Sequence, residues 1–382
     1  MRLKRGAAAR PERASHARPR RIALTLAATA LLLGAGSGCS TLGYYAQSVA
    51  GQAELLQRAR PIDEVIADPA TDAKLRARLE QVQDIRRFAA RELALPDNPS
   101  YTRYADLRRP FVVWNVFATQ PLSLALETSC FPVVGCVGYR GYFAEADARA
   151  WAEPLRARGL DVNVAGIPAY STLGWFADPV LSTFINLPEP ELARMIFHEL
   201  SHQVAYAAND TMFNESYATA VERAGVQRWL ARRGDPALAA SYAAYDGRRQ
   251  DFLALIERQR ERLAAIYASD ADDASRLAAK RAAFAQLRAD YDALKRERWG
   301  GFAGYDRFFA QDLNNAHIAA IAAYHQLVPA FERLLDEQHG DFARFHAEVR
   351  RLARLGPLGR AAAVARLCPD CQPAADTAAA PR

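Results

Sequence analysis

The segment His198-Glu199-Leu200-Ser201-His202 constrains this chain more than any other part of its sequence. On an α-helix, residues four apart leave the same face one turn from each other, so both imidazoles can reach one metal ion. Glu199, beside the first histidine, can instead contact a water molecule at the metal. Apolar residues recur at helical spacing around the motif, and Pro190 suits a first helical turn. The segment therefore predicts a helix that presents two zinc ligands and a general base.

Two histidines at this spacing can also be ordinary core or surface residues, so the motif needs a third ligand. A second predicted helix runs from Phe213 to Leu230, and Glu215 within it would complete a site of two histidines and one glutamate. Glu222 lies seven residues further on and can project from the same helical face. It is therefore either a residue that supports the ligands or a rival ligand. Asn209-Asp210-Thr211 suits the tight turn between the two helices.

The stretch from Met195 to Glu222 resembles the zinc metallopeptidases whose third ligand is a glutamate on the following helix. More closely, the chain resembles a bacterial family of lipoprotein aminopeptidases, over segments that span most of it. These segments are Cys130-Phe131-Pro132, Gly135-Cys136, Tyr139 to Phe143, Ala169 to Phe176, Asn214-Glu215-Ser216, Asn314-Asn315-Ala316 and Val328 to Phe331.

The spacing of the third ligand departs from the wider group. Twelve residues separate His202 from Glu215, and nineteen separate it from Glu222. The best-known peptidases of the group have about eighteen or nineteen at this place. We take Glu215 as the ligand because it follows an asparagine, as the ligand often does in that group.

The resemblance implies a peptidase with one Zn²⁺, most simply an aminopeptidase acting on peptides. Glu199 is then the general base, and Tyr324 is the first candidate for the donor that stabilises the oxyanion, with His317 and His325 next. An aminopeptidase also needs an acid to bind the substrate ammonium, and Glu127 and Glu145 are candidates.

Two further segments are candidates for substrate binding. Zincin peptidases commonly hold the substrate along an edge strand, and Ala169 to Phe176 resembles such a wall, with Tyr170 and Gly174 as contacts. Its alternative is a core strand with buried aromatic side chains. Asn314, Asn315 and His317 bring polar groups into an apolar helix, where an active-site wall would give them partners. Helix capping and core hydrogen bonding explain them equally well.

The first 39 residues have the pattern of an export signal. Residues 1–21 carry eight lysines and arginines, residues 22–33 are mostly apolar, and small residues lead to Cys39. The apolar run is shorter than the ~18 residues of a membrane-spanning helix. We expect Cys39 to become the lipidated N-terminus of a membrane-anchored, periplasm-facing bacterial lipoprotein; an ordinary cleaved signal is the alternative. Because this segment carries the positive net charge, a nucleic-acid partner is not supported.

The remaining chain predicts an α+β fold that is mainly helical. We expect a zincin-like catalytic region over residues 40–247 with a small antiparallel sheet, including a β-hairpin over residues 111–127 and a strand over residues 161–167. Residues 248–298 predict an antiparallel helical hairpin, broken at residues 269–273. Residues 299–371 predict a helical region that closes the active site, and residues 372–382 a disordered tail.

Four cysteines follow Cys39. In an exported protein, Cys130 with Cys136 and Cys368 with Cys371 predict two disulfides, while a zinc site or a redox pair is the alternative. Two other functions stay open for the whole chain. It could be a non-catalytic or chaperone-like envelope protein that keeps the zinc fold, or a zinc amidase that acts on cell-wall material.

Overall fold

The computed structural model describes residues 42–131 and 135–371, apart from the side chain of Asp370. The expected signal with Cys39 and the expected tail over residues 372–382 lie outside these ranges. The chain divides after Ala53 into two units, and residues 42–53 of the first are helical. In the second unit most residues are helical and the strands are short, so the expected mainly helical α+β class is confirmed. Within the described ranges, no helix has the length and apolar character needed to span a bilayer.

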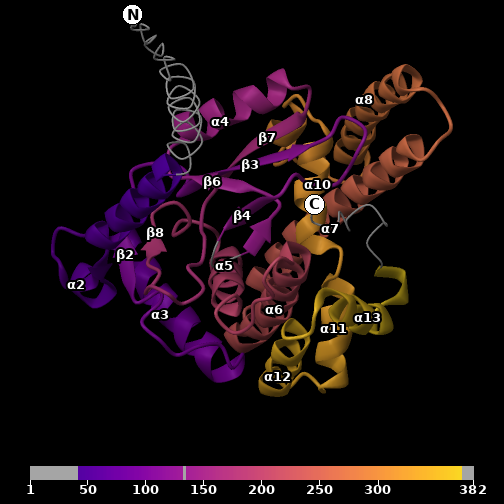
Figure 1. The fold of residues 1–382 in the computed structure, drawn as a ribbon. Helices are drawn as coiled ribbons and strands as arrows, with labels where there is room; N and C mark the ends of the chain where they lie inside the picture. The colour runs from indigo at the N-terminus through magenta and orange to yellow at the C-terminus, as the bar shows by residue number, and fades with distance from the viewer. Residues whose placement is uncertain (1–41, 132–134, 372–382) are drawn as a thin grey trace, which may run out of the picture. The chain divides into compact units, whose positions relative to one another are not determined.

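Short strands of the second unit form three small sheets (Figure 1). The strands are β1 (Arg60–Pro61), β2 (Arg103–Ala105), β3 (Val113–Thr119), β4 (Ser129–Phe131), β5 (Gly135–Val137), β6 (Arg140–Tyr142), β7 (Asp161–Ile167) and β8 (Val180–Leu181). Strand β3 lies between β6 and β7 and is antiparallel to both. Strand β2 pairs with β1 in antiparallel and with β8 in parallel orientation, and β4 pairs with β5.

The predicted β-hairpin over residues 111–127 is wrong in its second half. Strand β3 is buried along its whole length, but its partners are β6 and β7, and Leu126 forms only an isolated bridge to Thr119. The physical reason is that the carbonyls of Pro121 and Ser123 accept hydrogen bonds from the Asn315 amide at 3.2 and 2.9 Å. These carbonyls bind the side chain at the start of the helix that begins at Asn315, so they do not form hydrogen bonds to a neighbouring strand. The predicted strand over residues 161–167 is β7 and is confirmed.

The helices of the second unit surround these sheets (Figure 1). They are α2 (Ile62–Ala67), α3 (Ala73–Glu92), α4 (Glu145–Ala157), α5 (Glu189–Ser201), α6 (Thr211–Arg233), α7 (Pro236–Tyr267), α8 (Asp273–Glu297), α9 (Asp306–Phe309), α10 (Asn315–His325), α11 (Val328–Glu337), α12 (Phe342–Ala353) and α13 (Pro357–Leu367).

Helix α6 lies at the centre of the main hydrophobic core. It packs against α5, α10 and α11, and α5 in turn packs against α3. Gly225 lets α5 approach α6 closely, because a Cβ at this position would come within 2.8 Å of the Phe197 ring. Side chains from both helices are fully buried here, Ile196 and Tyr217 among them. The pair α5 and α6 is therefore held by close packing along both helices.

A second core holds the helical hairpin. Phe252 and Leu263 of α7 are buried with Phe284 and Leu287 of α8, and Ile318 of α10 joins them. The hairpin turn lies at residues 268–272, close to the predicted break, but α7 begins earlier, at Pro236, where the Asp235 side chain caps its first turn. Proline at a first helical position needs no partner for a backbone N–H, which favours this start.

The four cysteines form the two predicted disulfides. Cys130 bonds to Cys136 across the β4–β5 pair, and Cys368 bonds to Cys371 after α13. These sulfurs are therefore not available as zinc ligands in this structure.

His346 in α12 links distant parts of the main core. Its Nε2–H donates to the Leu93 carbonyl at 2.9 Å, and its Nδ1 accepts from the Tyr217 hydroxyl at 2.8 Å. Because the imidazole is buried, its pKa is lowered to about 4. Protonation of Nδ1 would also remove the acceptor for Tyr217.

We predict that His346 makes stability depend on pH. Below about pH 6.5 the unfolded chain binds a proton that the folded chain excludes, so the free energy of unfolding should fall by roughly 2 kcal/mol between pH 7 and pH 5. Urea unfolding of His346→Gln should show less of this fall than wild type. The exposed His339→Asn is the control and should keep the wild-type slope. Equal slopes for wild type and His346→Gln would contradict the prediction.

Candidate metal centre

Helix α5 and the residue after it supply the two histidines. The helix starts with Pro190 in its first turn and acidic side chains nearby, and it ends at Ser201, with His202 still in helical conformation as its cap. His198 and His202 therefore lie one turn apart on one face, as their spacing predicted.

A short turn then brings α6 back to α5. Asn209 takes a left-handed conformation with φ 65°, and the Asp210 side chain caps α6 by accepting from the Phe213 N–H. Asn214 closes the turn from the other side, because its amide accepts from the Ala207 N–H at 2.7 Å and donates to the Ala207 carbonyl at 2.8 Å. The asparagine before Glu215 thus sets how the second helix begins. This tight turn explains how only twelve residues between His202 and Glu215 can bring Glu215 back to the histidines.

Three potential ligand atoms converge at this corner. His198 Nε2 lies 3.2 Å from His202 Nε2 and 3.2 Å from Glu215 Oε2, and His202 Nε2 lies 3.6 Å from the same oxygen. Ligands at ~2.05 Å from one tetrahedral zinc ion would be separated by about 3.3 Å. Among the described residues, this is the one group of histidine, cysteine and acidic side chains close enough to hold a metal. The donor set and its spacing fit one zinc ion.

Glu222 lies behind His198 and outside this group. Its Oε2 accepts from His198 Nδ1 at 2.9 Å, and its Oε1 accepts from Arg194 Nε at 2.7 Å. A proton on Nδ1 leaves Nε2 of His198 free to bind a metal. Glu222 is thus placed to orient the ligand His198 and not to bind the metal itself.

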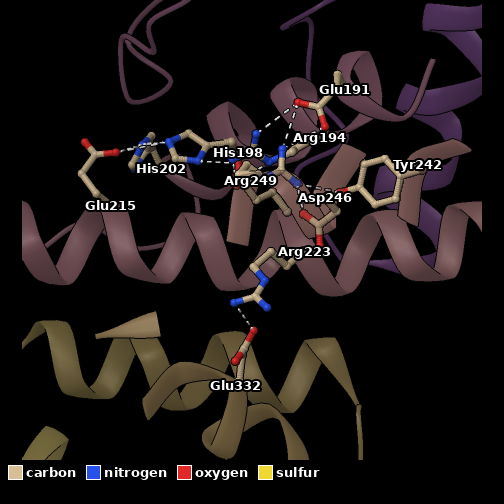
Figure 2. A network of polar contacts seen from close by, with 11 residues as sticks. Glu191, Arg194, His198, His202, Glu215, Arg223, Tyr242, Asp246, Arg249 and Glu332 are labelled. Carbon is tan, nitrogen blue, oxygen red and sulfur yellow. Dashed lines mark hydrogen bonds and ion pairs between the residues drawn. The ribbon is translucent and has the colours of Figure 1, made fainter. Parts of the chain in front are cut away.

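Arg194, the partner of Glu222, belongs to a larger charged network (Figure 2). Arg194 also binds Glu191 at 3.2 Å, and Glu191 binds Arg249 of α7 at 2.9 Å. Arg249 then contacts Asp246 and the Tyr242 hydroxyl. Through these contacts the helical hairpin is linked to His198, the first of the two histidines.

The electrostatics of the site favour a bound cation. Burial would raise the pKa of Glu215, but His202 and His198 lower it to about 2. Burial would also lower the pKa of His198, yet hydrogen bonds and charges of Glu215 and Glu222 raise it to about 10. Two carboxylates thus stabilise positive charge at His198, and a metal ion can take the place of that proton.

Glu199 and Tyr324 are close enough to the three ligands for the ligand charges to shift their pKa values. Glu199 is 6% exposed, and burial raises its pKa to about 7. The pKa of the Tyr324 hydroxyl lies well above its usual value because of burial and the carboxylates of Glu215 and, more weakly, Glu199. The phenol therefore stays protonated beside both acids and can act as a hydrogen-bond donor. Burial lowers the pKa of His325 to about 4, and Glu222 is the charged group that affects it most.

The predicted edge strand over Ala169 to Phe176 is wrong. The segment is a loop in which Leu173 and Gly174 both have positive φ, 56° and 82°. The buried Asp178 carboxylate accepts from the Thr172 backbone N–H at 3.0 Å and bends the chain. Gly174 nevertheless lies near the histidines, because a Cβ on it would be 3.7 Å from the side chain of Gln203, which follows His202. The pKa of Tyr170 is raised mainly by burial, then by Asp178 and, more weakly, by Glu199.

Asn314, Asn315 and His317 are not brought to the three ligands. They form the start of α10, about 10–15 Å along the helix axis from Tyr324. Asn314 caps the helix together with His317, and Asn315 is fully buried among the Gln120–Ser123 carbonyls and the Tyr267 hydroxyl. Capping and core hydrogen bonding, the alternative reading of these residues, accounts for their contacts.

The proposed ammonium acids also have other partners. Glu127 is exposed and accepts from Gln120 at 2.7 Å, while Glu145 is exposed at the start of α4 and pairs with Arg149. Neither contact lies at the ligand set.

Sequence reasoning missed several residues that border the site. The Tyr101 hydroxyl is buried without a hydrogen-bond partner in the described part of the chain, and its residue has φ 61°. Its pKa is raised by burial first and then by Glu199 and Asp178. Arg194, four residues before His198 on the same helical face, could have been noticed from spacing alone. Tyr101 and Asp178 could not, because only the fold brings them near Glu199.

The fold and the site define a mainly helical α+β protein with a candidate metal centre between two consecutive helices. A family model described as "Putative aminopeptidase" matches residues 43–364, and the chain belongs to this family. No curated protein and no solved structure matches the chain.

We predict that Glu222 strengthens metal binding without touching the metal. Glu222→Gln should weaken zinc binding by about 10- to 100-fold, because the His198 ring loses its charged partner. Glu191→Gln, which removes a charge from the same network but none from His198, is the control and should have a smaller effect. Competition with a chromophoric chelator measures both. Equal affinities for the two variants would show that Glu222 does not orient the ligand.

Proposed function

We propose that this protein is a zinc-dependent aminopeptidase. The observation that carries the proposal is the convergence of His198, His202 and Glu215 within 3.2–3.6 Å of one another, with the buried Glu199 beside them. Membership of the aminopeptidase family supports the substrate class. Zinc bound by these three residues would supply Lewis acidity toward a carbonyl and would make water a nucleophile at neutral pH.

The residues around the metal ligands can carry out the proton transfers of peptide hydrolysis. Glu199 accepts a proton from the attacking water and returns it to the departing amine, so that the amine leaves as a neutral group. Tyr324 donates a hydrogen bond to the carbonyl oxygen as negative charge develops there. Glu222, through His198 Nδ1, keeps that imidazole in the required tautomer and orientation.

We also propose that the enzyme works at the bacterial cell envelope, anchored through a lipid on Cys39. The basic, apolar and small-residue segments before Cys39 support this location. Peptides that reach the periplasm would then be its substrates.

Glu199→Gln should abolish turnover and leave zinc bound. The amide cannot accept the proton from water, so kcat should fall by at least about 100-fold. Metal analysis should still find one zinc ion per chain, because Glu199 is not a ligand. The exposed Glu145→Gln is the control. A Glu199→Gln protein with full peptidase activity would overturn the assignment of the base.

Tyr324→Phe should lower kcat by about 100-fold with little change in KM, because the lost hydrogen bond forms mainly in the transition state. Tyr206, whose pKa is also raised by Glu215 after burial, is the natural comparison. Tyr206→Phe should have a minor effect. The reverse order would identify Tyr206 as the donor.

The substrate class is tested with matched peptides that have a free or an acetylated amino terminus. An aminopeptidase cleaves only the free peptides, and a chelator stops the reaction. Cleavage of both sets would indicate an endopeptidase. Cleavage of cell-wall amides alone would indicate the amidase, and no hydrolysis by the zinc-loaded protein would indicate a non-catalytic role.

A further inference from the structure

A tight loop between β7 and β8 borders the candidate metal centre. Thr172 organises it: its hydroxyl donates to Asp178 Oδ1 at 2.7 Å and accepts from the Phe176 N–H at 3.1 Å. The Thr172 carbonyl accepts from the Trp175 N–H at 3.1 Å. Asp178 is 4% exposed, so the base of the loop is fixed in the core. The tip of the loop is thus held in one conformation by its own hydrogen bonds.

Two aromatic side chains project from this ordered tip into solvent. Trp175 is 72% and Phe176 is 48% exposed. Among the described residues, they are the only two large exposed apolar side chains that are adjacent in the chain. Each ring can bury roughly 150–250 Å² in a contact, so their exposure leaves a large apolar surface without a partner.

The same loop lies against the residue that follows the second histidine. A Cβ added to Gly174 would come within 3.7 Å of Gln203 Oε1, and Gln203 is held by Asn98 Nδ2 at 2.7 Å and by Ser100. The loop that carries the two aromatic rings therefore lies beside the residue that follows His202.

We propose that Trp175 and Phe176 form a subsite for an apolar side chain of the peptide substrate, next to the bond that is cleaved. This inference rests on the proposed peptidase function. The occupant is apolar because residues 169–177 carry no charged side chain with which a charged substrate residue could pair. The hydrogen-bonded turn pre-organises both rings, so little side-chain and loop entropy is lost when a substrate binds.

The subsite is tested by the specificity of the zinc-loaded mature protein. Free-amino peptides are compared that differ only in phenylalanine or serine on either side of the scissile bond. Trp175→Ala and Phe176→Ala should lower kcat/KM for the phenylalanine peptide by about 10- to 100-fold, mainly through KM, and leave the serine peptide nearly unchanged. Leu358→Ala, which removes an exposed apolar side chain from α13, is the control and should change neither.

The role of the turn is tested at Thr172. Thr172→Val keeps the shape of the side chain but removes both hydroxyl contacts, and it should reduce the phenylalanine preference. Thr172→Ser keeps the hydroxyl and should retain the preference. A loss of zinc in Thr172→Val would reveal general unfolding, so zinc content is measured for each variant.

The outcomes separate the subsite from the proposed function. If both peptides are cleaved and their ratio is the same in wild type and Trp175→Ala, the subsite is wrong and the peptidase stands. If no peptide is cleaved, calorimetry with Glu199→Gln decides: tighter binding of the phenylalanine peptide that depends on Trp175 supports the subsite alone. If Trp175 and Phe176 instead govern binding to anionic lipid vesicles and not peptide preference, the occupant is a membrane surface and the proposal fails.

Discussion

The hydrogen bond between His198 Nδ1 and Glu222 is the contact on which the site depends. It joins α5 to α6 in the interior of the protein and fixes which nitrogen of His198 faces the other two ligands. A buried carboxylate is costly unless it is paired, and Glu222 is paired twice, with His198 and with Arg194. The same contact therefore contributes to the packing of two helices and to the orientation of a ligand.

The arrangement of charges and lone pairs at this corner suits a bound cation. His198 Nε2 and His202 Nε2 lie 3.2 Å apart, so two imidazole N–H groups cannot point at each other there. A proton on one of the two nitrogens, donated to Glu215, gives a hydrogen-bond partner to only some of the three ligand atoms. A divalent ion with three ligands satisfies all of them at once, because each ligand then directs a lone pair at the same point. The surrounding helices hold these groups more rigidly than loops would.

The loop over residues 170–178 illustrates how far local pattern can mislead. Its tyrosine, tryptophan and phenylalanine have high strand propensity, which agrees with the edge strand that the resemblance to a zincin substrate wall predicts. A single buried carboxylate, Asp178, decides otherwise, because it accepts from the Thr172 N–H that a ladder would need and also from the Thr172 hydroxyl. Strand propensity depends on having a neighbouring strand, and this segment has none in the described structure.

Local sequence was enough to define the helices of the site. The i, i+4 spacing of His198 and His202, the capping role of Asp210 and the apolar periodicity of the hairpin act within one or two turns, so they can be seen without knowledge of the fold. What tertiary structure alone decided is which distant groups meet. It placed Glu222 behind His198 and outside the ligand set, and it assigned Asn315 to backbone carbonyls near Pro121. These outcomes depend on how helices pack and on which buried polar groups must find partners, and neither is encoded in the spacing of neighbouring residues.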